Sequence, residues 1–156
     1  MNGAPRMTRS AAREIAVHLI YAVQCTGEDV QTVLDTRFEE TYYALLSGEN
    51  EVYAELPKGK QLNYIRSVVS GVCARREELE ADLAKYSIGW NVNRISRLAR
   101  ACMELAMYEA LYVEDVPMNV AINEAVKLAQ KYEEPETVAF VNGILGAFSR
   151  DQRPET

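Results

Sequence analysis

Apolar residues recur along this chain at the spacing of an α-helix. The first such stretch spans residues 8–25, where the apolar positions lie three or four residues apart: Ala12, Ile15, Ala16, Leu19, Ile20 and Val23. This spacing places one apolar stripe along a helix. Thr8 or Ser10 is suited to cap its start, and Gly27 is suited to end it.

The same pattern predicts further helices, over residues 30–46, 61–86, 98–112, 118–132 and 135–148, with one more short helix capped by Asn91 or Asn93. In the 30–46 helix we expect four side chains to face inward: Val33, Leu34, Phe38 and Tyr42. The polar residues 47–60 are expected to form a loop or a short extra turn. No stretch alternates with the two-residue period of a strand. We therefore predict an all-α protein of about seven helices.

Two helices near the C-terminus carry further signals. Pro117 suits the first position of the 118–132 helix, because its missing N–H costs nothing there. That helix is apolar around most of its circumference, with Ile122 and Val126 beside the main stripe. It is too apolar for a surface helix, so we expect it to be the buried central helix. In the last helix, Gly143 is expected to permit close packing.

Chain length and hydropathy suit a single domain of 156 residues. We expect a flexible lead over residues 1–7, one helical domain over residues 8–150, and a disordered tail over residues 151–156. No stretch approaches the roughly 18 consecutive apolar residues of a transmembrane helix. The first residues lack the apolar segment of a secretory signal. The sequence thus favours a cytoplasmic protein without a membrane partner.

Residues that commonly carry enzyme chemistry are sparse. The three cysteines, Cys25, Cys73 and Cys102, show no C-x-x-C spacing, and we interpret them as reduced buried thiols. His18, the one histidine, is expected to be a packed helix residue. No phosphate-binding loop, zinc motif or nucleophile motif occurs. We expect neither enzymatic activity nor a metal or cofactor.

The net charge of −6 argues mildly against binding nucleic acid. Its distribution changes that picture. Residues 28–56 hold eight acidic residues against Arg37 alone, whereas the first 26 residues hold three arginines against Glu14. A surface polarised in this way can bind a polyanion locally.

The basic residues form two stripes. Arg9 and Arg13 are four residues apart, so they share a helix face, and Tyr21 lies two turns further on. Arginines followed by an exposed aromatic ring suit single-stranded RNA, whose phosphates meet charge and whose bases stack. Two arginines on an amphipathic helix are more often just its solvated face. The second stripe, Arg94, Arg97 and Arg100, leaves open a contact with phosphates, with an acidic partner or with the chain's own acids.

Five segments resemble the NusB family of bacterial transcription antitermination factors. Arg13 to Tyr21 resembles its arginine-rich first helix, and residues 64–72 and 90–109 resemble later family stretches. The strongest likeness is that of residues 116–132 and 140–145 to the family's C-terminal signature. This resemblance implies one all-helical domain of two packed subdomains. It also implies binding of boxA RNA from nascent ribosomal RNA together with the ribosomal protein NusE, and an indirect link to RNA polymerase and other Nus factors.

Carried over by position, the resemblance implies RNA-binding roles for Arg9, Arg13, Tyr21, Phe140 and Asn142. It implies partner contacts for Arg97, Arg100 and Glu104. The chain departs from the family at Ser10 and Ala11, which stand where basic residues are usual, and at Ala99 and Glu104 in the partner region. The departures predict weaker RNA binding by the isolated protein.

Two other functions remain open. The chain also resembles the NusB-like accessory module found ahead of RNA cytosine methyltransferases. Alternatively, it is a helical protein–protein adaptor that has lost autonomous RNA binding, which the thinned arginines and the acidic total would suit. Exposure of Arg9, Arg13 and Tyr21 on one face would distinguish the RNA-binding protein from the adaptor.

Overall fold

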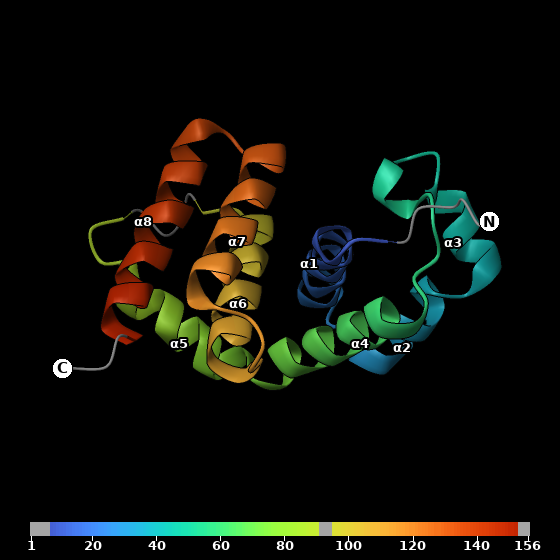
Figure 1. Cartoon of the computed structure of the whole chain (residues 1–156), viewed down its shortest axis with the longest axis horizontal. Helices are drawn as coiled ribbons and strands as arrows, with labels where there is room; N and C mark the ends of the chain where they lie inside the picture. The colour runs from blue at the N-terminus through green and yellow to red at the C-terminus, as the bar shows by residue number, and fades with distance from the viewer. Residues whose placement is uncertain (1–6, 91–94, 153–156) are drawn as a thin grey trace. The chain divides into compact units, whose positions relative to one another are not determined.

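The computed structural model describes residues 7–90 and 95–152. Within these ranges the chain forms eight α-helices and one short 3-10 helix, with no strand (Figure 1), which confirms the all-α prediction. None of the described helices is both long enough and apolar enough to cross a membrane. The predicted lead up to Arg6, the short helix near Asn91 and Asn93, Arg94, and residues 153–156 all lie outside the described ranges.

The chain divides into two compact units, Met1–Cys73 and Ala74–Thr156. The first unit holds α1 (Arg9–Thr26), α2 (Val30–Arg37), α3 (Glu40–Leu46), the 3-10 helix η1 (Glu51–Tyr53) and nearly all of α4 (Gly59–Ala74). The second unit holds α5 (Arg76–Tyr86), α6 (Arg97–Tyr112), α7 (Met118–Tyr132) and α8 (Pro135–Gln152).

Helix α1 follows the sequence prediction closely. The Oγ1 atom of Thr8 accepts a hydrogen bond from the backbone N–H of Ala11 at 3.0 Å, which caps the helix start. Gly27 ends the helix in the left-handed conformation, with φ 72°. All six predicted apolar positions are buried. Arg13, Glu14 and Val17 are buried as well, so α1 is covered on more sides than one stripe requires.

The predicted single helix over residues 30–46 is wrong, because the chain forms two helices, α2 and α3. Glu39 is extended, with ψ 129°, and its carboxylate accepts hydrogen bonds from the backbone N–H groups of Thr41 and Tyr42. These bonds start a new helix and lower the pKa of the Glu39 carboxyl. The break shifts the helix phase, so that Tyr43 is buried in place of Tyr42, which was predicted to face inward.

An aromatic cluster attaches the acidic segment to α1. The rings of Tyr43 and Tyr53 meet edge-on, with centroids 5.6 Å apart. The Tyr43 hydroxyl donates a 2.9 Å hydrogen bond to the backbone carbonyl of Glu55, and burial raises the pKa of that hydroxyl. The Tyr53 hydroxyl is hydrogen-bonded to Nδ1 of His18. This contact confirms that His18 is a packed helix residue.

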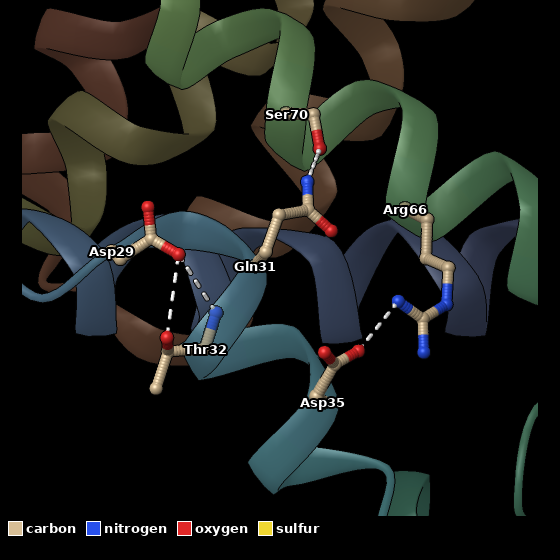
Figure 2. Close-up of polar contacts among 6 residues, drawn as sticks. All are labelled: Asp29, Gln31, Thr32, Asp35, Arg66 and Ser70. Atoms are coloured by element: carbon tan, nitrogen blue, oxygen red, sulfur yellow. Dashed lines mark hydrogen bonds and ion pairs between the residues drawn. The ribbon is translucent and has the colours of Figure 1, made fainter.

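Polar contacts join α2 to α4 within the first unit (Figure 2). The Nε2 atom of Gln31 donates to Oγ of Ser70 at 3.2 Å. Nη1 of Arg66 lies 3.1 Å from Oδ1 of Asp35. Exposed pairs of this kind contribute at most about 1 kcal/mol. They orient α2, and its apolar side chains supply most of the attachment.

The predicted helix over residues 61–86 is also wrong, because it breaks at Arg75, which has φ −109° and ψ 23°. Helix α4 ends before this residue and α5 begins after it. The break falls beside the boundary between the two units. The two apolar stripes of this segment therefore serve separate cores, with Val68 and Val72 buried before the break and Leu79 and Leu83 buried after it.

Helix α6 is the central helix of the second unit, since it contacts α5, α7 and α8 and is the most deeply buried helix of that unit. Every residue from Ala101 to Met107 is buried, and so is Glu109. The prediction that the 118–132 helix is central is therefore wrong. Small residues at Ala99, Ala101 and Ala106 suit close approach of neighbouring helices to α6.

Helix α7 has the predicted bounds but lies at the side of its unit. Its buried positions form one stripe: Ala121, Ala125, Leu128 and Ala129. Val120 is 36% exposed, because an apolar residue away from the stripe has no helix to cover it. Pro117 is extended, with ψ 148°, and precedes the helix as its N-cap, so its predicted place at the first helical position is wrong.

The C-terminal helix is longer than predicted. Helix α8 runs to Gln152, so the helix does not end at Phe148 and residues 151 and 152 are not disordered. The Asp151 carboxylate lies 3.0 Å from Nζ of Lys85 and accepts a hydrogen bond from the Tyr86 hydroxyl. The thiol prediction also needs correction, because Cys102 is buried but Cys25 is exposed.

We predict that Leu128→Ala lowers the free energy of unfolding by about 2–5 kcal/mol, because a buried leucine is replaced by a cavity. Val120→Ala on the same helix is the control, and we expect a change of about 0.5 kcal/mol or less at that half-open position. Urea unfolding followed by circular dichroism measures both. Equal losses in the two variants would contradict the orientation of α7.

We predict that Asp151 titrates below its ordinary pKa of 3.8, because the Tyr86 hydroxyl and then the Lys85 ammonium favour the carboxylate. A lowered pKa stabilises the fold at pH values above 3.8, and this contribution disappears as the pH falls through the lower value. Carboxyl-carbon NMR gives the midpoint, and Tyr86→Phe should raise it. An unchanged midpoint in Tyr86→Phe would exclude this hydrogen bond as the cause.

Candidate nucleic-acid interface

Arg9 ties the start of α1 to the start of α4. Its Nε atom donates a 2.8 Å hydrogen bond to Oε1 of Gln61. Its guanidinium carbon lies 4.0 Å from the centre of the Tyr64 ring, which is a cation–π contact. Gln61 and Tyr64 are three residues apart and therefore share a face of α4. The hydrogen bond to Gln61 uses Nε, so the two terminal nitrogens of Arg9 can still donate hydrogen bonds to another group. The contacts with Gln61 and Tyr64 fix the direction in which these nitrogens point.

Arg13 lies over the same ring, 5.9 Å from its centre. The prediction that both arginines project from one face of α1 is thus confirmed. Arg13 is only 6% exposed, however, whereas Arg9 is half-buried. Arg13 therefore belongs to the packed side of this cluster, and Arg9 forms its solvent side.

Tyr21 is the exposed aromatic residue of α1, with 41% of its surface open to solvent. Its position toward the C-terminal end of the helix agrees with the sequence pattern. Common exposure of Arg9, Arg13 and Tyr21 would distinguish an RNA-binding protein from an adaptor, and the structure meets this criterion only in part: Tyr21 is exposed, Arg9 is half-buried and Arg13 is buried.

Phe140 and Asn142 belong to the second unit. Phe140 is buried, and its ring meets Trp90 nearly at a right angle, with centroids 4.7 Å apart. Asn142 is exposed on α8. A Cβ atom on Gly143 would lie 2.7 Å from Cζ2 of Trp90, which confirms the predicted close packing at this glycine. Phe140 and Gly143 together hold the half-exposed Trp90 ring against α8.

The expected partner-binding residues differ in exposure. Arg97 is exposed at the start of α6, and Arg100 is half-buried one turn later. Glu104 is 2% exposed, because it points into the packed part of the central helix. The structure thus leaves Arg97 and part of Arg100 at the surface, and it places the Glu104 carboxylate in the interior.

Sequence reasoning missed Tyr64 and Gln61, for which it gave no function. The spacing of Tyr64 and Gln61 on one helix was visible in the sequence. Their contacts with Arg9 were not, because Arg9 and Gln61 are 52 positions apart and Tyr64 lies further still along the chain. It also missed Lys58 and Lys60, which lie beside Gln61 at the start of α4. In the part of the chain that the structure describes, no group of three or more His, Cys, Asp or Glu residues could hold a metal ion.

A model of the NusB family matches residues 10–150 of this chain. The chain belongs to the NusB family. The transcription antitermination protein NusB of Acetivibrio thermocellus is 38% identical over 140 residues, which cover 90% of this chain and 87% of that protein. The protein of the same name from a Thermoanaerobacter species is 32% identical over 146 residues, covering 94% and 93%.

Solved NusB structures share the fold. NusB of T. maritima superposes with a TM-score of 0.76 at 24% identity and covers 96% of each chain. A structure of the antitermination factors NusB and NusE in complex with double-stranded RNA gives a TM-score of 0.71 at 19% identity, covering 92% of this chain and 96% of that one. At these identities the likeness establishes the NusB fold alone.

We predict opposite effects for two glycines of α8. Gly143→Ala should destabilise the protein by about 1–3 kcal/mol, because its methyl group displaces the Trp90 ring. Gly146→Ala should stabilise it by up to about 1 kcal/mol, since the nearest atom to the added Cβ is the flexible Nη1 of Arg150 at 3.5 Å.

Fluorescence of Trp90, the single tryptophan, and urea unfolding measure the two glycine variants. Gly143→Ala should also shift the emission of Trp90. If Gly143→Ala stabilised the protein as Gly146→Ala does, the close contact with Trp90 would be excluded.

Proposed function

We propose that this NusB-family protein is a transcription antitermination factor that binds boxA-like single-stranded RNA together with NusE. It acts in the cytoplasm on nascent ribosomal RNA, in concert with RNA polymerase and other Nus factors, and it catalyses no reaction. Family membership supports the class of function. The arrangement around Arg9 supports the mode of binding.

The single observation that carries the proposal is the orientation of Arg9. The hydrogen bond to Gln61 and the stacking on Tyr64 hold the guanidinium in place. An arginine with its terminal nitrogens directed by such contacts can donate two hydrogen bonds to one phosphate. Binding then costs less side-chain entropy than it would for a freely rotating arginine.

The other proposed RNA-binding residues have different roles. Tyr21 offers an exposed ring on which an unpaired base stacks. Arg13 is a positioning residue, since its buried guanidinium supports Tyr64 and adds positive potential behind Arg9. In the second unit, Asn142 offers an exposed amide to RNA, and Phe140 supports the Trp90 ring.

NusE compensates for the small number of basic residues at the start of α1. Ser10 and Ala11 supply no charge, so the isolated chain makes few phosphate contacts and binds RNA weakly. A NusB of the same fold is known in complex with NusE and double-stranded RNA, which supports a complex of this chain with NusE and RNA. Arg97 and Arg100 are the proposed partner-facing residues, and Glu104 lies in the interior one turn after Arg100.

We predict that Arg9→Ala weakens binding of boxA-like RNA and lowers the slope of log affinity against log salt concentration by roughly 0.7, the value for one phosphate contact on a single strand. Fluorescence anisotropy of labelled RNA, with and without NusE, measures both quantities. Arg76→Ala removes an exposed arginine of α5 and serves as the charge-matched control. Equal effects of the two substitutions would point to net charge and exclude a specific Arg9 contact.

We predict that Tyr21→Ala weakens RNA binding by about 1–3 kcal/mol with little change in the salt slope, because it removes base stacking and no charge. Tyr21→Phe keeps the ring and should bind nearly as the unmodified protein does. The double-stranded form of the same sequence should compete poorly, since its bases are already stacked. If neither the protein nor its mixture with NusE binds boxA-like RNA, the adaptor function replaces this proposal.

A further inference from the structure

Two lysines stand on either side of the first residue of α4. Lys58 and Lys60 are exposed, and Gln61, the neighbour of Lys60, holds the Arg9 guanidinium. Gly59 between them has φ 55°, a conformation that other residues rarely adopt. The turn at this glycine places both lysines at the junction of α1 and α4.

A surface pocket of about 470 Å³ lies at this junction. The segment before α1 contributes Met7. The remaining lining residues come from the segment leading into α4 and from the first turn of α4: Glu55, Lys58, Gly59, Lys60 and Gln61. The pocket thus carries two ammonium groups against one carboxylate. Arg9, held by Gln61, adds a third positive charge beside it.

The lysine charges at the pocket differ from those of Arg66 and Lys85. Arg66 and Lys85 are each paired with an aspartate. Neither Lys58 nor Lys60 forms an ion pair with any residue in the described ranges. Glu55, the acid of the pocket, accepts a 3.3 Å hydrogen bond from the backbone N–H of Met7. The two ammonium groups are therefore available to an external anion.

We propose that Lys58 and Lys60 bind backbone phosphates of the same RNA that Arg9 contacts. The inference rests on the proposed function and deepens it. The two lysines add phosphate contacts from the start of α4 to the few that α1 makes with uncharged residues at Ser10 and Ala11. Lysine acts on phosphate as a point charge, so this contact adds affinity at any RNA sequence.

The test is a salt titration of RNA binding by the double variant Lys58→Ala/Lys60→Ala. Two lost phosphate contacts should lower the log–log slope by roughly 1.4, at about 0.7 for each contact. If the variant and the unmodified protein bind equally at 1 M salt, a slope difference of about 0.7 per lysine gives about a fivefold loss of affinity per lysine at 0.1 M salt, a tenfold lower concentration. The loss should be the same for boxA-like RNA and for a shuffled sequence.

Three controls separate a local contact from other effects. Lys58→Arg/Lys60→Arg keeps the charge and should keep the slope. Lys127 is an exposed lysine of α7 in the second unit. The Lys127→Ala variant loses one charge there, and its salt slope should change by less than half as much as the loss of one pocket lysine changes it. Thermal unfolding should be unchanged in the double alanine variant, since both lysines are exposed.

Glu55→Gln provides a variant with the opposite sign. The glutamine keeps an oxygen to accept from Met7 and removes the negative charge of the pocket. RNA should bind several-fold more tightly to this variant. Unchanged or weaker binding would place the RNA away from the pocket and overturn the inference.

The results for Arg9 and the lysines distinguish the two proposals. If Arg9→Ala and Tyr21→Ala weaken binding while the double lysine variant keeps its slope, the pocket is not a phosphate site and the proposed function stands. If all of these variants bind as the unmodified protein does, both proposals fail. A reduced slope in the lysine variant, restored by arginine at both positions, supports the pocket.

Discussion

The stacking of Arg9 on Tyr64 is the contact on which the candidate interface depends. Together with the hydrogen bond to Gln61, it joins the starts of α1 and α4, which are distant in sequence. A partly buried cation–π pair contributes about 0.5–2 kcal/mol, enough to hold a side chain in one orientation. This contact directs Arg9 toward solvent, and it brings Lys58 and Lys60 beside the basic end of α1.

An acidic protein can carry such an interface because much of its negative charge has a structural task elsewhere. Glu39 caps α3, Asp29 caps α2, and Asp35 pairs with Arg66. Charges on an exposed surface are screened within about 10 Å at 0.1 M salt. A polyanion at the start of α1 therefore responds to the nearby lysines and arginine more than to the net charge of −6.

Several charged groups lie in the interior of helices whose sequence suggested one apolar stripe. Arg13 and Glu14 are buried in α1, and Glu104 and Glu109 are buried in α6. Both helices are thus covered on more than one side. Buried charges are retained in folded proteins only with polar partners, so these residues act in packing and orientation. The exposed residues of α1 are consequently confined to its two ends, with Ser10 at the start and Tyr21, Cys25 and Thr26 toward the end.

The sequence alone determined the helical class, the caps of α1, the bounds of α7 and the family, because helical periodicity and capping depend on neighbouring residues. It also indicated Arg9, Tyr21 and Asn142 at positions that are accessible in the structure. The helix break at Glu39 arises from its side chain, which accepts hydrogen bonds from backbone N–H groups and starts a new helix. The break at Arg75 falls between two separate cores. Neither cause is visible in the periodic spacing of apolar residues. Only the tertiary structure placed α6 at the centre of its unit, buried Arg13, and set Arg9 on Tyr64, because these outcomes depend on contacts between residues that are far apart along the chain.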